Sequence, residues 1–254
     1  MKLNFGRQIM DTLFIVEGEY EKTLLKRILH HVMEYQLICQ GNRDSKYMQF
    51  KKYDNGTLKG RVAVFCTEES YIKSINNQDH IDNIARILVD EHGYDMRNSC
   101  IFYLFDRDPN SNTDSAGIRS LICSLKNPYE NADFTYGGLI LLSYPCIESY
   151  KVSNFKDRTC DFLYALGSDL KVAFGTDKDI QDNKICTTSI LKATNEMMKW
   201  YNESRIEINY NTGNYAIEEA FDFQEAFYSK EKAYQLFSSL SCAFIELGII
   251  ELED

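Results

Sequence analysis

Residues 11–21 read Asp-Thr-Leu-Phe-Ile-Val-Glu-Gly-Glu-Tyr-Glu, and this stretch decides the fold. Its apolar run, residues 11–16, ends abruptly in acidic residues on either side of Gly18. From residue 19 to about residue 38, apolar side chains recur every three or four positions, which is the spacing of an amphipathic helix. The stretch therefore predicts a short buried strand, a sharp turn at the glycine and a helix.

The same alternation continues through the first 150 residues. Further strands are predicted at residues 61–66, 100–105 and 138–143, and further helices at residues 81–91 and 115–126. A polar segment, residues 41–60, separates the first helix from the second strand. Continuously apolar strands that alternate with helices indicate an α/β fold, with a mostly parallel sheet flanked by helices.

The pattern changes after about residue 155. Residues 187–201, 215–228 and 229–247 are predicted to be helices, so we expect an α/β domain at residues 1–154 and an α-helical C-terminal region at residues 155–254. Charge divides in the same way. Residues 155–254 hold 10 basic and 18 acidic residues, a net charge of −8, whereas residues 1–154 hold 18 and 20, a net charge of −2.

Composition excludes several classes of protein. With 44% hydrophobic and 26% charged residues, the chain is typical of a folded globular protein. Its net charge of −10 excludes a generally basic, nucleic-acid-coating surface, so any contact with DNA or RNA needs a local patch or a bound cation. No apolar stretch is long enough to span a bilayer, and we expect no membrane association. Eight scattered cysteines without a CxxC pair are typical of free thiols and predict a cytoplasmic protein.

Acidic residues follow three of the predicted strands. Glu17 and Glu21 follow the first, Asp106 and Asp108 the third, and Glu148 comes shortly after the fourth. Ligands bind at the carboxyl edge of a parallel sheet, where these side chains would meet. Grouped carboxylates repel one another unless a cation lies between them, and their oxygens suit Mg²⁺ or Mn²⁺.

Each acid also has a purely structural interpretation, which the sequence leaves open. Glu21 and Glu148 could be ordinary acids in the first turn of a helix, where they are stabilising. Asp106 and Asp108 could be solvated loop residues or could form an Asx turn before Pro109.

These motifs resemble the TOPRIM superfamily of topoisomerases, bacterial-type primases and nucleases. Residues 14–21, Phe-Ile-Val-Glu-Gly-Glu-Tyr-Glu, are similar to the family's strand and glutamate-glycine turn, and residues 103–108, Tyr-Leu-Phe-Asp-Arg-Asp, to its Asp-x-Asp. Residues 143–148, Ser-Tyr-Pro-Cys-Ile-Glu, are similar to a segment of RloB-like nucleases, which together with OLD-type nucleases are the most similar branch. Two departures are Tyr20, where threonine is common, and Arg107, which replaces a small residue.

The resemblance implies an endonuclease that uses Mg²⁺ or Mn²⁺ to cleave phosphodiester bonds of RNA or DNA. It implies a core metal site of Glu17, Asp106 and Asp108, with Glu21 and Glu148 as further ligands or a base that orients water. It also implies an effector of anti-phage defence with an ATPase partner, and a homo-oligomer is possible. The alternative is a non-catalytic TOPRIM-like module that regulates a larger ATPase complex.

Residues 43–61 are the strongest candidate for contact with nucleic acid. Basic residues alternate there with aromatic ones, a composition that suits phosphates and stacked bases. The alternative is a solvated surface loop. The residues that we expect to bind nucleic acid are Lys46, Lys51, Lys52 and Arg61, together with Arg107 from the Asp-x-Asp motif.

Overall fold

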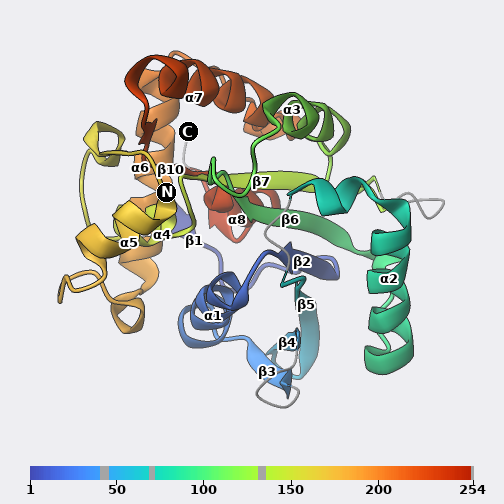
Figure 1. Ribbon diagram of the computed structural model, residues 1–254. Coiled ribbons are helices and arrows are strands. Elements are labelled where there is room, and N and C mark those ends of the chain that lie inside the picture. Colours follow the sequence, from blue (N-terminus) through green and yellow to red (C-terminus); the bar gives the residue numbers. More distant parts are fainter. Residues whose placement is uncertain (41–45, 69–71, 131–135, 253–254) are drawn as a thin grey trace.

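The computed structural model describes residues 1–40, 46–68, 72–130 and 136–252. Within these ranges, seven strands form a central sheet with helices on both sides (Figure 1). In order across the sheet they are β10 (Phe237–Ser238), β7 (Leu139–Tyr144), β6 (Cys100–Asp106), β2 (Thr12–Val16), β5 (Thr57–Cys66), β4 (Tyr47–Asp54) and β3 (Gln36–Gln40). The four strands from β7 to β5 are parallel, and the outer three are antiparallel to their neighbours. The α/β class is thus confirmed, as a mixed sheet around a parallel core.

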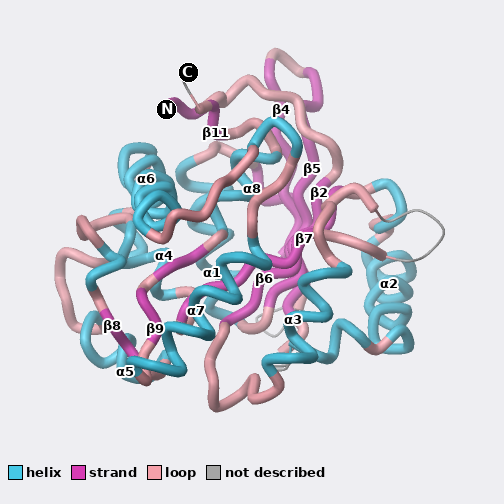
Figure 2. The backbone as a smooth tube through the Cα atoms, turned by 90° about the horizontal axis from the view of Figure 1, so that it is seen from above, coloured by secondary structure: helices cyan, strands magenta, loops and turns pink. Residues whose placement is uncertain are grey.

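Helices connect the parallel strands on both faces of the sheet. Helix α1 lies on one face of the sheet, and α2 and α3 lie on the other (Figures 1 and 2). Among the described residues, every helix is too short or too polar to span a bilayer. The helices are α1 (Glu19–Lys26), α2 (Gln78–His92), α3 (Ser115–Ser124), α4 (Glu148–Ser153), α5 (Gly167–Phe174), α6 (Thr187–Glu203), α7 (Ile217–Glu231) and α8 (Leu240–Glu246).

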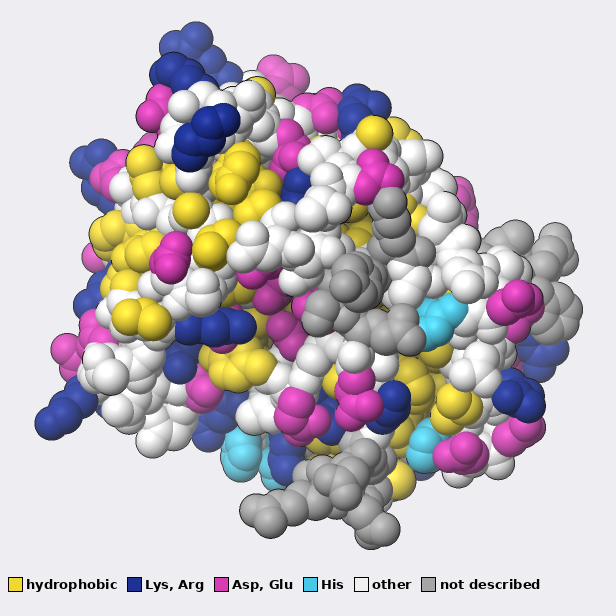
Figure 3. Space-filling view, in the orientation of Figure 1, with side chains coloured by type: hydrophobic (Ala, Val, Ile, Leu, Met, Phe, Trp, Pro, Cys, Tyr) yellow, Lys and Arg dark blue, Asp and Glu magenta, His cyan; other side chains and the backbone are white. Residues whose placement is uncertain are grey.

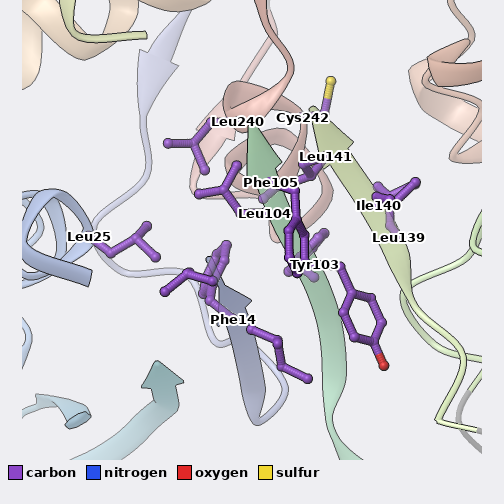
Figure 4. Close-up of a cluster of buried hydrophobic side chains, with 14 of the residues drawn as sticks. Phe14, Leu25, Tyr103, Leu104, Phe105, Leu139, Ile140, Leu141, Leu240 and Cys242 are labelled. Atoms are coloured by element: carbon purple, nitrogen blue, oxygen red, sulfur yellow. The ribbon is translucent and has the colours of Figure 1, made fainter. Parts of the chain in front are cut away.

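The core is centred on strands that are covered on both faces. Every residue of β2, β6 and β7 is buried, which explains their continuous apolar sequences. The Phe14 and Phe102 rings stack across neighbouring strands, with centroids 5.2 Å apart. Leu240 and Cys242 of α8 lie beside β6 and β7 (Figure 4), so the C-terminal region also contributes to this core.

Two features between residues 19 and 60 differ from the prediction. The helix expected over residues 19–38 is shorter: α1 continues as a π-helical turn, Arg27–Val32, and the chain then enters β3. The segment 41–60 includes β4 and the first residues of β5, which form a hairpin. Asn55 and Gly56 both have positive φ angles, 47° and 79°, as a two-residue hairpin turn requires.

The C-terminal region is not entirely helical, and the helix expected over residues 229–247 is wrong. Helix α7 ends at Glu231, and the chain then forms β9 (Tyr234–Gln235), β10 and α8. Strand β10 extends the central sheet by pairing with β7. Two small sheets complete the fold, one of β9 with β8 (Leu163–Tyr164) and one of β1 (Lys2–Leu3) with β11 (Ile250–Glu251).

The expected boundary at residue 154 stays a prediction. Residues on both sides of it belong to one hydrophobic cluster, which includes Phe14 and Ile140 as well as Trp200 and Leu240. Strands β1 and β11 bring the first and last described residues together. The C-terminal region is therefore packed directly against the sheet.

Candidate metal and phosphate site

Three parallel strands end at the same edge of the sheet and bring the predicted acids together. Strands β2, β6 and β7 are in register, so that Val16 lies beside Leu104, and Asp106 beside Ser143. Figure 3 shows acidic side chains gathered in a hollow near the centre of this face, with basic and apolar side chains around it. The carboxyl edge of a parallel sheet is where ligands bind in such folds.

Asp106 lies at the centre of the group. Its Oδ1 accepts a hydrogen bond of 2.7 Å from the Ile147 backbone N–H, and its own N–H donates one of 3.1 Å to Glu17 Oε2. The residue is only 8% exposed. Burial, followed by the negative charges of Glu21, Glu17 and Glu148, raises the pKa of Asp106 well above its ordinary value. A bound cation would offset this unfavourable concentration of charge.

Glu21 combines a structural contact with a place in the acidic group. Its carboxylate accepts a 2.9 Å hydrogen bond from the Gly18 backbone N–H at the start of α1. Burial raises the pKa of Glu21 to about 7, to which the nearby Glu17 and Glu148 carboxylates also contribute. The helix-start interpretation is therefore correct for its contact with Gly18, and the carboxyl is also poised to gain or lose a proton near neutral pH.

Glu148 and Cys146 complete the closest set of possible ligands. Within the described ranges, the only group of three or more acids, histidines or cysteines with ligand atoms within 4.8 Å of one another is Asp106, Cys146 and Glu148. Glu148 Oε2 is buried and has no hydrogen-bond partner among these residues. Such an atom indicates a site that lacks a partner. Burial raises the pKa of the Cys146 thiol.

Asp108 forms the Asx turn that the sequence allowed. Its Oδ1 accepts a 2.9 Å hydrogen bond from the backbone N–H of Asn110. Gly167 lies between its second oxygen and the Cys146 thiol: a Cβ placed on that glycine would lie 3.5 Å from Asp108 Oδ2 and 3.1 Å from Cys146 Sγ. Of the predicted trio Glu17, Asp106 and Asp108, only Asp106 belongs to the closest set of ligand atoms, and Glu17 contacts it by accepting the hydrogen bond of its backbone N–H.

Lys171 brings a positive charge to the acidic group from α5. Its Nζ lies 3.6 Å from Glu148 Oε1, and its side chain is 55% exposed. Burial lowers the pKa of Lys171, but Glu148, Cys146 and Asp106 together raise it above its ordinary value. Sequence reasoning assigned no role to Cys146, although it lies in the quoted motif two residues before Glu148. It missed Lys171 because this residue belongs to no motif and reaches the site only through tertiary packing.

Arg107 does not reach this site. Alternation along β6 directs it away from Asp106 and Asp108, and it is 2% exposed. Its guanidinium donates a 2.8 Å hydrogen bond to Glu225 Oε2 of α7 and one of 2.7 Å to the Asn112 carbonyl. We therefore correct the predicted role of Arg107: it anchors α7 to the sheet and is not available to a nucleic acid.

Most of the predicted basic surface lies at the opposite edge of the sheet. Arg61 forms an ion pair with Asp11 at the amino end of β2, about 16 Å along β5 from Cys66. Lys52 is buried, with its Nζ 2.8 Å from the Met33 carbonyl oxygen. Burial also lowers the pKa of Lys52. Neither residue faces the carboxylates.

The remaining basic residues of the segment divide between the two edges. Lys51 lies opposite Arg61 in the hairpin. Lys46 is at the carboxylate edge, beside the end of β5, where its Nζ lies 2.9 Å from Glu68 Oε2. Arg43 lies outside the described residues. The nucleic-acid hypothesis for residues 43–61 is therefore retained at this edge only for Lys46.

The cluster provides two carboxylates and one thiol for a divalent cation, beside a partly exposed lysine that can contact an anion. A search against protein-family models finds no match to the chain, and no curated protein matches it. The resemblance to TOPRIM nucleases therefore rests on the short strand-end motifs alone.

Proposed function

We propose that the protein is a divalent-metal-dependent endonuclease that cleaves phosphodiester bonds in RNA or DNA. The proposed metal dependence is supported by the cluster of Asp106, Cys146 and Glu148. One buried oxygen of Glu148 has no hydrogen-bond partner among the described residues. The phosphodiester part is supported by the resemblance of the strand-end motifs and by the lysine at the rim of the cluster.

The residues present fit a divalent cation. Asp106 and Glu148 would hold it, with Cys146 as a sulfur ligand, Glu17 next to Asp106, and Asp108 across Gly167 from Cys146. Carboxylate oxygens suit Mg²⁺ and Mn²⁺, and a nearby thiol favours Mn²⁺ of the two. Such a cation supplies Lewis-acid stabilisation of the scissile phosphate and an acidified water.

The chain's own groups have separate parts in this proposal. Glu21, whose carboxylate lies near those of Glu17 and Glu148, orients the attacking water or accepts its proton. Lys171 contacts a non-bridging phosphate oxygen from the exposed side of the site. The Ile147 N–H and the Glu17 carboxylate hold Asp106 in place.

Cleavage assays on single-stranded and duplex RNA and DNA test this function. We expect activity with Mg²⁺ or Mn²⁺, its loss in EDTA, and a fall of roughly 100-fold or more in Asp106→Asn and Glu148→Gln. Asp90→Asn, an exposed acid on α2, is the matched control and should cleave normally. Cleavage that survives both EDTA and Asp106→Asn would refute the proposal.

The proposal includes an ATPase partner and a cytoplasmic role in defence against phage. All eight cysteines are free thiols, which suits a reducing compartment. The net charge of −8 in residues 155–254 suits a partner-facing surface. Co-purification with any ATPase that is encoded beside this gene tests the partner, and size-exclusion chromatography tests the homo-oligomer. A stable monomer that cleaves without any partner would argue against the assembly but not against the nuclease.

A further inference from the structure

A small pocket opens beside the carboxylate group, between α1, α4 and α5. Its volume is about 100 Å³. Glu148 lines this pocket and also belongs to the candidate metal-binding cluster, so the pocket and the cluster are adjacent. The other residues that line the pocket are Tyr20, Lys151, Val152, Leu170, Lys171, Phe174, Gly175 and Ile180.

One wall of the pocket is apolar and aromatic. Val152, Leu170 and Ile180 belong to a small buried cluster, separate from the main core, against which Phe174 packs. The Phe174 ring is braced from behind by Phe162, with ring centroids 5.9 Å apart. Phe174 is therefore a fixed aromatic surface at the pocket, of the kind on which a base stacks.

The polar side of the pocket carries two lysines. Lys151 Nζ lies 3.1 Å from Asp182 Oδ1, which also accepts a 3.0 Å hydrogen bond from the Tyr20 hydroxyl. The Lys151 side chain is 18% exposed, so this contact holds it in a fixed position. Lys171 stands between the pocket and the acidic group. One aromatic side chain and two lysines among the residues that line the pocket match a ligand that joins a flat ring to a phosphate.

We infer that this pocket receives the base of one unpaired nucleotide next to the scissile phosphate. The inference rests on the proposed function and specifies its substrate as single-stranded, or locally unpaired, nucleic acid. A base inside a duplex cannot enter such a pocket unless it leaves the stack. The pocket is smaller than the cavity of about 150 Å³ that encloses a benzene ring, so a base enters it only in part, and the single ring of a pyrimidine enters further than the two rings of a purine.

Binding measured without cleavage tests the pocket. The full-length protein in EDTA is titrated against short fluorescent homopolymers of deoxythymidine, deoxyadenosine, uridine and adenosine, and against a duplex of equal length. We expect the pyrimidine strands to bind more tightly than the purine strands of the same sugar, and the duplex to bind least. Phe174→Ala should weaken binding of the pyrimidine strand roughly tenfold and reduce the preference for pyrimidine.

Three further variants separate stacking from packing. Phe174→Leu keeps an apolar side chain but removes the ring, and should bind as weakly as Phe174→Ala. Phe174→Tyr keeps the ring and should bind like the wild type. Phe162→Ala removes the bracing ring outside the pocket and should change affinity less than about twofold. Far-ultraviolet circular dichroism identifies any variant that has not folded.

Each possible result of these binding measurements either supports or overturns the inference about the pocket. Unchanged binding in both Phe174→Ala and Phe174→Leu, tighter binding of purine strands, or equal binding of the duplex would each overturn the inference, as would failure to bind any single strand. Other results would refute the proposed function instead. One is an Asp106→Asn protein that still cleaves. Another is a wild-type protein that binds strands through Phe174 but never cleaves them.

Discussion

Replacement of Glu21 by glutamine should stabilise the metal-free protein at alkaline pH. In the folded chain burial raises the pKa of this carboxyl from its ordinary 4.5 to about 7. Between these two values the folded state therefore holds a proton that the unfolded state has released. The stability that Glu21 contributes is highest below about pH 4.5, and it falls as the pH rises toward 7.

The size of this effect follows from the same two values. Each pH unit between 4.5 and about 7 is worth about 1.4 kcal/mol, so the charged Glu21 costs about 3 kcal/mol above pH 7. Glutamine has nearly the same shape and its carbonyl oxygen can still accept from the Gly18 N–H. Glu21→Gln should therefore be more stable than the wild type by about 3 kcal/mol at pH 8, and the difference should vanish near pH 4.5.

Urea denaturation in EDTA measures this difference. Trp200, the only tryptophan, is 1% exposed and reports unfolding through its fluorescence. Glu19→Gln is the matched control, because Glu19 lies in the same turn of α1 but its side chain is 68% exposed. A Glu21→Gln protein no more stable than the wild type at pH 8, or a Glu19→Gln protein with the same gain, would refute the reasoning.

Two other substitutions test the site and its support. Gly167→Ala places a methyl group 3.0 Å from Cys146 Cβ and 3.1 Å from its Sγ, so it should displace the thiol, weaken Mn²⁺ binding and cost about 1–3 kcal/mol of stability. Calorimetric titration with Mn²⁺ measures the binding, and unchanged affinity would contradict the prediction. Arg107→Ala leaves Glu225 without its buried partner and should cost about 3 kcal/mol of stability in urea. A loss below about 1 kcal/mol would show that the ion pair is not important.

The parallel core could be predicted because its strands are buried on both faces. An apolar run such as residues 100–105 leaves few alternatives, and the acids that follow such runs must lie at one edge of the sheet. The hairpin of β4 and β5 was missed although Asn55-Gly56 is a strong turn signal, because the polar residues around it suggested a loop. Strand β10 has two residues and no periodicity, so only its pairing with β7 defines it.

The residues of the site could be predicted only in part, because contacts between distant parts of the sequence decide which side chains meet. Position after a strand identified Glu17, Asp106 and Glu148, but which oxygens converge depends on backbone contacts such as that of Ile147 with Asp106. Lys171 lies 65 residues beyond Asp106 in the sequence and reaches the site through the packing of α5 on α4. Such long-range contacts leave no local pattern in the sequence.

The location of charge, rather than its total, decides whether this acidic chain can hold a nucleic acid. The most basic stretch of the sequence lies largely at the edge away from the carboxylates, whereas residues 155–254, with a net charge of −8, provide Lys171 at the site itself. Phosphate contacts act over short distances because salt screens charges beyond about 8–10 Å. Lysines next to the carboxylates therefore matter more to a bound strand than the acidic surface elsewhere. The proposed nuclease site and the proposed partner-facing surface are therefore compatible in one chain.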